Sequence, residues 1–160
     1  MKLFSNLCLI VAVSSNGVIG NSNTPGMIWH CREELRHFRD STMGSVIVMG
    51  RITAETTGKL SGRDCIVLST DPDYTLPGFT TMNIDDFLTY TQQNQSLSFM
   101  ICGGGKVYDK LRNYCSNIIV STMNFEADGD IKFFVPMEFE LYATKEYDEF
   151  VVCHYFNYIY

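Results

Sequence analysis

Residues 97–112 of the chain read LSFMICGGGKVYDKLR, a run of apolar side chains followed by three glycines and a helical pattern. Consecutive apolar residues over 97–102 are typical of a strand buried on both faces, and 106–112 is predicted to be a helix. A strand that leads directly into a helix is the repeating unit of an α/β fold. The glycines would let the chain approach a ligand closely at the carboxyl end of the strand, although a simple flexible turn would explain them as well.

The same order of strand and helix recurs before this segment. Other buried strands are predicted at 7–13, 46–49 and 65–69, and other helices at 31–42, 51–57 and 84–93, the last with Asn83 as its N-cap. The stretches 117–125, 139–147 and 150–160 are strand-like with no long helix between them, so we expect antiparallel pairing. The predicted fold class is therefore α/β. We expect a single domain over 1–160, with a central, mostly parallel twisted sheet, antiparallel C-terminal edge strands and about four flanking helices.

The charges are distributed unevenly along this chain of 160 residues, whose net charge is −6. Residues 126–149 contain eight acidic side chains and two lysines, whereas 32–63 contain six of the twelve basic side chains. A nucleic-acid-binding protein would need a large basic face, so we expect no nucleic-acid partner. A local basic cluster suits a small anionic ligand, unless the pattern is an ordinary solvated surface.

The six cysteines show neither a disulfide framework nor the paired spacing of a metal site. Several lie within apolar runs, where free thiols behave as small core residues, and this usage favours a reducing compartment. The apolar run at 7–13 is too short for a membrane span and lacks the features of a signal peptide. We therefore expect a cytoplasmic protein with no metal ion and no membrane partner.

Glu34 is the leading candidate for acid–base chemistry. It lies four residues before Phe38 on the predicted helix, where Cys31, Leu35 and Phe38 form an apolar stripe. A carboxyl group on such a stripe loses hydration, so its pKa should rise and it can hold a proton near neutral pH or bind a cationic ring edge. The alternative is a glutamate at the border of the stripe that extends into solvent.

A long loop over 14–28, with Gly, Asn and Pro residues, leads to Trp29, the only tryptophan. Loops of this length within a compact domain often act as lids, and an indole there can exclude water and donate one hydrogen bond. Half-buried packing is the alternative role of this side chain.

Three predicted strands end in groups that suit an anion. These groups are, in chain order, Gly50, Arg51, Ile52 and Thr53, then Ser69 and Thr70, then Gly103, Gly104 and Gly105. Backbone N–H groups, hydroxyls and a guanidinium all bind phosphate, and the carboxyl ends of parallel strands meet at one edge of a sheet. The spacing is not the GxGxxG pattern of dinucleotide-binding folds.

Taken in order, the motifs resemble those of the dihydrofolate reductase family over nearly the whole chain. The matching positions are Ala12, 17–20, Trp29, Glu34, 48–53, Gly62, Arg63, 68–70, 102–108, Ser121, Gly129 and Asp130. The resemblance implies an oxidoreductase that moves hydride from NADPH to C6 of 7,8-dihydrofolate while a proton reaches N5. The product would be tetrahydrofolate, which supports one-carbon metabolism and thymidylate synthesis.

The resemblance also implies which residues bind the substrate. Glu34 would hydrogen-bond the amino group and a ring nitrogen of the pterin and assist protonation of N5, with Ser121 supporting it and Trp29 as the third catalytic residue. The pterin and aminobenzoyl pocket would be lined by Ile10, Ala12, Leu35, Phe38, Leu60 and Cys102. Arg63 would grip the α-carboxylate of the glutamate tail.

For the cofactor, NADPH, the resemblance implies a site along the strand ends. Ala12, Ile19 and Gly20 would bound the nicotinamide, and Arg51, Ser69 and Thr70 would hold the 2′-phosphate that selects NADPH over NADH. The pyrophosphate would lie against Gly103, Gly104, Gly105, Lys106, Val107 and Tyr108. Further contacts would come from Gly50, Ile52, Thr53, Leu68 and Cys102. The family has a cis peptide at the position between Gly103 and Gly104, and we expect a monomer whose partner is its small-molecule substrate, dihydrofolate.

The chain departs from the family pattern at a few positions. Ile28 stands where proline usually precedes the loop tryptophan, Ala54 stands where many relatives have a bulky aromatic, and the turn before Arg63 is shortened. Two alternatives stay open: a reductase of another pterin or pyrimidine substrate on the same fold, and a non-catalytic nucleotide-binding module. The first alternative would not need Glu34 and Arg63 in these roles.

Overall fold

A computed structural model of the protein describes residues 3–158. Its elements, in chain order, are β1 (Phe4–Val13), β2 (Val18–Gly20), α1 (Arg32–Thr42), β3 (Val46–Gly50), α2 (Arg51–Thr57), β4 (Cys65–Leu68), β5 (Phe79–Met82), α3 (Ile84–Gln93), β6 (Phe99–Ile101), α4 (Gly105–Leu111), the 3₁₀ turn η1 (Arg112–Tyr114), β7 (Cys115–Met123), β8 (Ile131–Lys132), β9 (Phe139–Glu146) and β10 (Phe150–Asn157).

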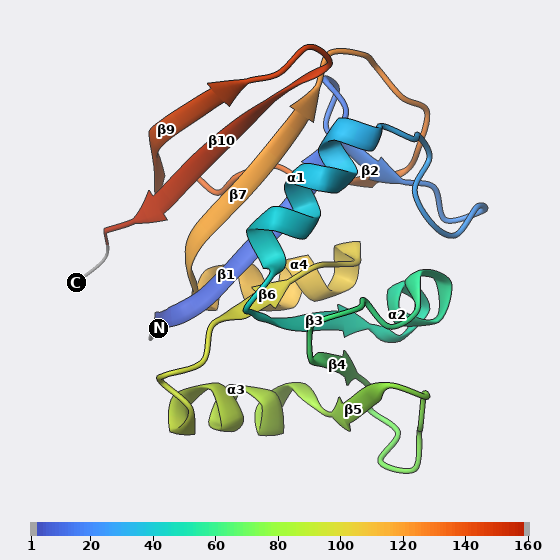
Figure 1. The fold of residues 1–160 in the computed structure, drawn as a ribbon, viewed down its shortest axis with the longest axis vertical. Coiled ribbons are helices and arrows are strands. Elements are labelled where there is room, and N and C mark those ends of the chain that lie inside the picture. The colour runs from blue at the N-terminus through green and yellow to red at the C-terminus, as the bar shows by residue number, and fades with distance from the viewer. Residues whose placement is uncertain (1–2, 159–160) are drawn as a thin grey trace.

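One sheet of eight strands has the order β5-β4-β3-β6-β1-β7-β10-β9. Neighbouring strands from β5 to β7 run parallel, whereas β10 pairs antiparallel with both β7 and β9. In Figure 1, β9 and β10 (red) lie at one end of this sheet and β5 (green) at the other. The predicted fold class is confirmed: an α/β architecture with a mostly parallel sheet, an antiparallel C-terminal edge and helices α1 to α4.

The central strands are buried on both faces, as their continuous apolar runs predict. Leu9 of β1 belongs to one core cluster and the next residue, Ile10, to a second, because alternate residues of a strand face opposite sides of the sheet. The first cluster includes Phe87 of α3 and Leu111 of α4, and the second is packed by Phe38 of α1 and includes Ala54 of α2. The helices therefore cover the sheet in two pairs, one pair on each face.

The structure confirms the predicted helix cap at Asn83 but differs from the sequence predictions at several strands. The Asn83 side chain accepts a hydrogen bond from the Asp86 backbone N–H at 2.7 Å, which confirms the predicted N-cap. The short strands β2, β5 and β8 were not predicted, because they lack the continuous apolar runs that indicated the equally short β4 and β6. The predicted strand over 117–125 already begins at Cys115, directly after η1. Residues 159–160 of the last predicted strand lie outside the described residues.

The long loop before α1 is held against the rest of the domain by a small two-stranded sheet of β2 and β8. Gly129, in the turn before β8, passes so close to β2 that a Cβ atom there would collide with the backbone oxygen of Gly20. Next to it, Asp130 accepts hydrogen bonds from the backbone N–H of Ser22, at 2.8 Å, and from the Ser22 hydroxyl. These contacts fix Ile19 and Gly20 beside the carboxyl ends of the central strands.

Candidate active site

Glu34 lies on the inner face of α1 and is only 6% exposed. The helix starts at Arg32, after Cys31 in an extended conformation, and it also buries Thr42, a little over two turns after Glu34. The prediction that Leu35 shares this interior is wrong, because Leu35 follows Glu34 by about 100° around the helix and is 44% exposed. The predicted burial of the carboxyl group itself is confirmed.

Burial raises the pKa of the Glu34 carboxyl above its ordinary value, and the neighbouring Ser121 hydroxyl partly offsets that rise. Ser121 is on β7, where it pairs with Ala12 of β1, so α1, β1 and β7 meet at this point. No ion pair involves Glu34 within the described part of the chain. The carboxyl group is therefore able to retain a proton at a higher pH than an exposed glutamate does.

Two of the predicted catalytic residues have a buried polar atom with no hydrogen-bond partner of ordinary geometry among the described residues: Ser121 Oγ and Trp29 Nε1. The Trp29 indole packs edge-on against Phe125, with ring centroids 5.6 Å apart, and against the cluster that contains Val152. Val152 in turn pairs with Ser121 across β10 and β7, so the two unsatisfied atoms belong to adjoining parts of the site. Unsatisfied buried polar atoms are rare in proteins, and here they indicate positions for a ligand or for ordered water.

The glycines after β6 form the next part of the site. The peptide bond between Gly103 and Gly104 is cis, as the family resemblance implied. Gly103 has a positive φ of 118°, and its carbonyl oxygen accepts a hydrogen bond from Gly50 N–H at 2.8 Å. A Cβ atom on Gly104 would lie only 3.0 Å from the Thr53 hydroxyl oxygen. The ends of β3 and β6 are thereby held together, and this close approach leaves no room for a side chain at Gly50 or Gly104.

Tyr108 anchors this glycine turn to the sheet. Its hydroxyl donates a hydrogen bond to the Ile10 carbonyl oxygen at 2.7 Å, and its backbone N–H donates to Gly104 O at 2.9 Å. A Cβ atom on Gly105 would lie 2.6 Å from a methyl group of Ile131 and 3.9 Å from a methyl group of Ile19. The structure therefore brings Ile19 from the long loop onto the glycine turn, as the cofactor prediction requires.

A pocket of about 290 Å³ lies beyond the glycine turn. Five predicted cofactor residues line it: Leu68, Ser69, Thr70, Lys106 and Val107. Sequence reasoning missed the other lining residues, which are Asn83, Ile84, Asp85 and Lys110. Lys110 could have been found from the sequence, because it lies four residues after Lys106 and so shares a face of α4 with it.

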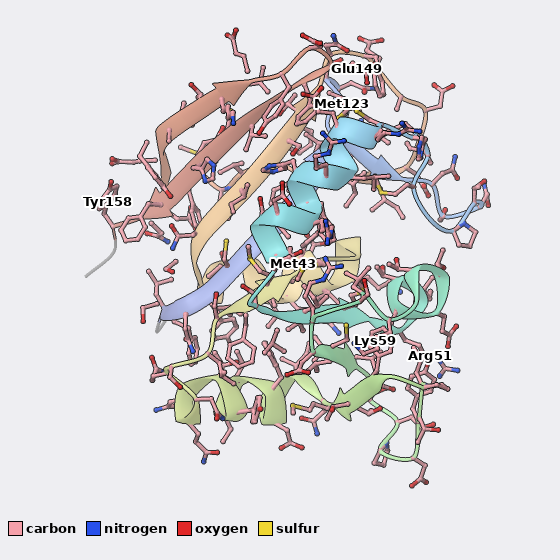
Figure 2. All side chains as sticks on the ribbon, in the orientation of Figure 1. Met43, Arg51, Lys59, Met123, Glu149 and Tyr158 are labelled. Atoms are coloured by element: carbon pink, nitrogen blue, oxygen red, sulfur yellow. The ribbon has the colours of Figure 1, made fainter. Side chains whose placement is uncertain are left out.

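Arg51 and Ile52, at the start of α2, do not line this pocket, and Ile52 is 69% exposed. Figure 2 shows Arg51 on the same side of the molecule as α2 and Lys59. The Arg51 Nε donates to Glu55 Oε1 at 3.0 Å, and the guanidinium lies 4.3 Å from the centre of the Tyr74 ring. Neither Glu55 nor Tyr74 was singled out from the sequence.

Four of the predicted pterin-pocket residues belong to one apolar cluster: Ile10, Phe38, Leu60 and Cys102. Burial raises the pKa of the Cys102 thiol well above its ordinary value, so this sulfur is a neutral, apolar part of the wall. Nearby, Arg63 is 8% exposed, and its guanidinium donates to Thr42 Oγ1 at 2.9 Å and to Ser61 O at 3.1 Å. Arg63 and Lys59 also line a second pocket, of about 350 Å³.

Within residues 3–158, no group of three or more histidine, cysteine or acidic side chains is arranged to hold a metal ion. All six cysteines are free thiols. None of the helices in the described range is both long enough and apolar enough to cross a membrane.

Comparisons with known proteins consistently match this chain to dihydrofolate reductases. A family model described as dihydrofolate reductase matches residues 6–157. The chain is 34% identical to a dihydrofolate reductase of Mycoplasma genitalium over 156 residues, which cover 93% of this chain and 96% of that protein. It is 29% identical to the type 1 dihydrofolate reductase of Escherichia coli, over 88% of this chain and 90% of that one.

Among solved structures, the fold is similar to that of a dihydrofolate reductase from Enterococcus faecalis in complex with NADP(H) and RAB-propyl. The TM-score is 0.84 at 25% sequence identity, and the match covers 99% of this chain and 100% of the other.

Proposed function

Since the chain belongs to the dihydrofolate reductase family and is an oxidoreductase that reduces dihydrofolate with NADPH, we propose that Glu34 is the acidic residue of this reaction. The observation that carries the proposal is the burial of its carboxyl group, which raises the pKa and leaves the group without an ion pair in the described part of the chain. Another pterin or pyrimidine reductase and a non-catalytic module are not favoured, because the matched proteins are dihydrofolate reductases.

In this proposal, Glu34 holds the pterin through hydrogen bonds to its amino group and a ring nitrogen, and assists delivery of a proton to N5. When it is bound, NADPH supplies the hydride, which goes to C6. The hydride and the proton together saturate the C6–N5 double bond of 7,8-dihydrofolate and give 5,6,7,8-tetrahydrofolate and NADP⁺. Ser121 and Trp29 support this chemistry: the Ser121 hydroxyl lies beside the Glu34 carboxyl, and the Trp29 indole N–H has no partner among the described residues and can bind the ring or an ordered water.

The rest of the substrate site is assigned by its chemistry. The apolar cluster of Ile10, Phe38, Leu60 and Cys102 supplies a wall for the pterin and aminobenzoyl rings, and Ala12 and the half-exposed Leu35 complete it. Arg63 binds the α-carboxylate of the glutamate tail, and its contacts to Thr42 and Ser61 fix the orientation of its guanidinium.

The described residues also fit NADPH. Ala12, Ile19 and Gly20 border the position of the nicotinamide, and we assign the pyrophosphate to the backbone of Gly50 and the three glycines and to the Thr53 hydroxyl beside Gly104. The adenosine fits the pocket of about 290 Å³, in which hydroxyls and two lysines face the ligand. We assign the 2′-phosphate to Arg51, Ser69 and Thr70, with Ile52 at the outer edge of the site.

The test is the oxidation of NADPH in the presence of 7,8-dihydrofolate, with and without methotrexate. We expect wild-type turnover that methotrexate blocks, and nearly complete loss of turnover in Glu34→Gln with an unchanged far-ultraviolet circular dichroism spectrum. Turnover of the variant at the wild-type rate would refute the role of Glu34. A wild-type protein that is inactive with dihydrofolate would refute the assigned reaction.

We further propose that the protein works as a cytoplasmic monomer without a nucleic-acid partner. Its six free cysteines suit a reducing compartment, and its net charge of −6 disfavours binding to phosphate backbones. Sedimentation at micromolar concentration, with and without duplex DNA, tests the oligomeric state and the nucleic-acid statement: a dimer would contradict the monomer, and co-sedimentation with DNA would contradict the absence of a nucleic-acid partner.

A further inference from the structure

Tyr74 joins two segments that carry different parts of the proposed phosphate site. It lies in the loop between β4 and β5, a few residues after Ser69 and Thr70, and it contacts Arg51 and Glu55 of α2. We call the three side chains Arg51, Glu55 and Tyr74 the arginine clamp.

One carboxylate oxygen connects the three members of the clamp. Glu55 Oε1 accepts a hydrogen bond from the Tyr74 hydroxyl at 2.7 Å and another from Arg51 Nε at 3.0 Å. The Tyr74 ring lies against the face of the guanidinium, 4.3 Å from its central carbon. These contacts lower the pKa of Glu55, first through the tyrosine hydroxyl and then through the arginine, so the carboxylate stays ionised.

Tyr74 is itself held in place by its own loop. Its carbonyl oxygen accepts a hydrogen bond from the Thr81 hydroxyl at 2.8 Å, and its ring packs against the apolar cluster that contains Ala54. Earlier in the loop, the Asp71 backbone N–H donates to the Ser69 hydroxyl oxygen at 3.1 Å. The clamp therefore sets the position of Arg51 relative to the loop that carries Ser69 and Thr70.

The clamp leaves the outer edge of the guanidinium unoccupied. Nε donates to Glu55, and no other hydrogen bond or ion pair of ordinary geometry involves the Arg51 guanidinium among the described residues. A guanidinium whose plane is fixed can present these nitrogens as a fork to two oxygens of a phosphate group. An isolated ion pair this exposed would contribute little to stability. Here, however, the arginine is also stacked on Tyr74, and its carboxylate partner is held by a second hydrogen bond. The guanidinium is therefore already ordered and loses less side-chain entropy when a phosphate binds.

We propose that Tyr74 is a positioning residue for cofactor specificity: it holds Arg51 ready for the 2′-phosphate, and so favours NADPH over NADH. The inference rests on the proposed function, which assigns that phosphate to Arg51. NADH lacks the phosphate group, so its binding does not depend on the clamp.

The experiment compares steady-state kinetics with NADPH and with NADH, at saturating dihydrofolate, in Tyr74→Leu and Tyr74→Phe. In Tyr74→Leu we expect the KM for NADPH to rise about fivefold, the loss expected from releasing one ordered side chain, with kcat and the KM for NADH unchanged. Tyr74→Phe keeps the stacked ring and should raise the KM for NADPH about twofold. An unchanged KM for NADPH, or an equal rise with both cofactors, would overturn the proposal. Tyr142→Leu, an exposed tyrosine on β9, is the matched control.

Arg51→Ala separates this inference from the proposed function. If Arg51→Ala leaves the preference for NADPH intact, the phosphate assignment is wrong and the role of Tyr74 is wrong with it. If Arg51→Ala removes the preference but Tyr74→Leu does not, only the role of Tyr74 is refuted. In the double variant, Tyr74→Leu should add nothing to Arg51→Ala, because its effect passes through Arg51, and additive effects would overturn the proposal.

Discussion

Glu34 and Arg51 both lie in the first turn of a helix that borders the proposed site, yet their surroundings are opposite. Glu34 is 6% exposed and has no ion pair in the described part of the chain, whereas the side chain of Arg51 is 54% exposed and is bonded to Glu55. Desolvation controls the properties of the first group, and counter-charges and dissolved ions control those of the second. The reacting end and the phosphate end of the site should therefore respond to different perturbations.

The largest difference should appear in the pH dependence of turnover. Burial raises the pKa of Glu34, so the carboxyl holds its proton at low pH and loses it as the pH rises through that value. Above the pKa, we expect kcat to fall about tenfold for each pH unit, since only the protonated form assists protonation of N5. The residual rate of Glu34→Gln should not vary with pH. A wild-type profile that is flat on the alkaline side, or a variant with the same slope, would contradict this role.

The next largest effect concerns a buried cation, Arg63. Removal of its guanidinium in Arg63→Ala should raise the KM for dihydrofolate about 30-fold, the lower range for the loss of one partner in a buried charge interaction. The KM for NADPH should stay unchanged, because the cofactor occupies the other end of the site. Arg39→Ala, which removes an exposed arginine from α1, is the control. An unchanged KM for dihydrofolate in Arg63→Ala would remove the tail contact from the proposal.

Burial of Glu34 should also affect stability. Because its pKa is higher in the folded than in the unfolded state, the folded protein binds the proton more tightly, and this contribution to stability is lost as the pH rises. Glu34→Gln carries no charge, so near pH 7 it should be more stable than the wild type by about 1 kcal/mol in urea unfolding. The gain should vanish below about pH 4, where the unfolded state is protonated too. Glu33→Gln, at the exposed neighbouring position, should show no such gain, and a less stable Glu34→Gln would refute the argument.

The contrast between the two regions also explains what could be predicted from the sequence. The burial of Glu34 follows from the spacing of residues along one helix, and the parallel sheet follows from the order of strands and helices. The cis bond between Gly103 and Gly104 came from the family resemblance alone. Each of these features could be predicted because the residues that determine it lie within one segment of the sequence or within one set of family motifs.

The sequence could not predict contacts between segments that meet only in the folded chain. Tyr74 reaches Glu55 from a different element, and no periodic pattern relates the two positions. Asp85 lines the same pocket as Lys106 because the start of α3 lies beside α4. The prediction for Leu35 was wrong because this residue lies at the edge of the apolar stripe of α1. Whether a side chain at that edge is buried depends on which segments pack against the helix, and the sequence of the helix does not show this.

The smallest expected effect is a dependence on salt at the phosphate end alone. Raising NaCl from about 0.05 M to about 0.5 M shortens the screening length several-fold, so the exposed guanidinium of Arg51 should attract the 2′-phosphate less strongly. We expect the KM for NADPH to rise about threefold over this range and the KM for NADH to rise less, since NADH carries no 2′-phosphate. The rate at saturating substrates should stay constant, because the carboxyl group of Glu34 is shielded from dissolved ions by the protein around it. Equal salt dependence for both cofactors would mean that the screened contact lies at the pyrophosphate, which they share, and not at Arg51.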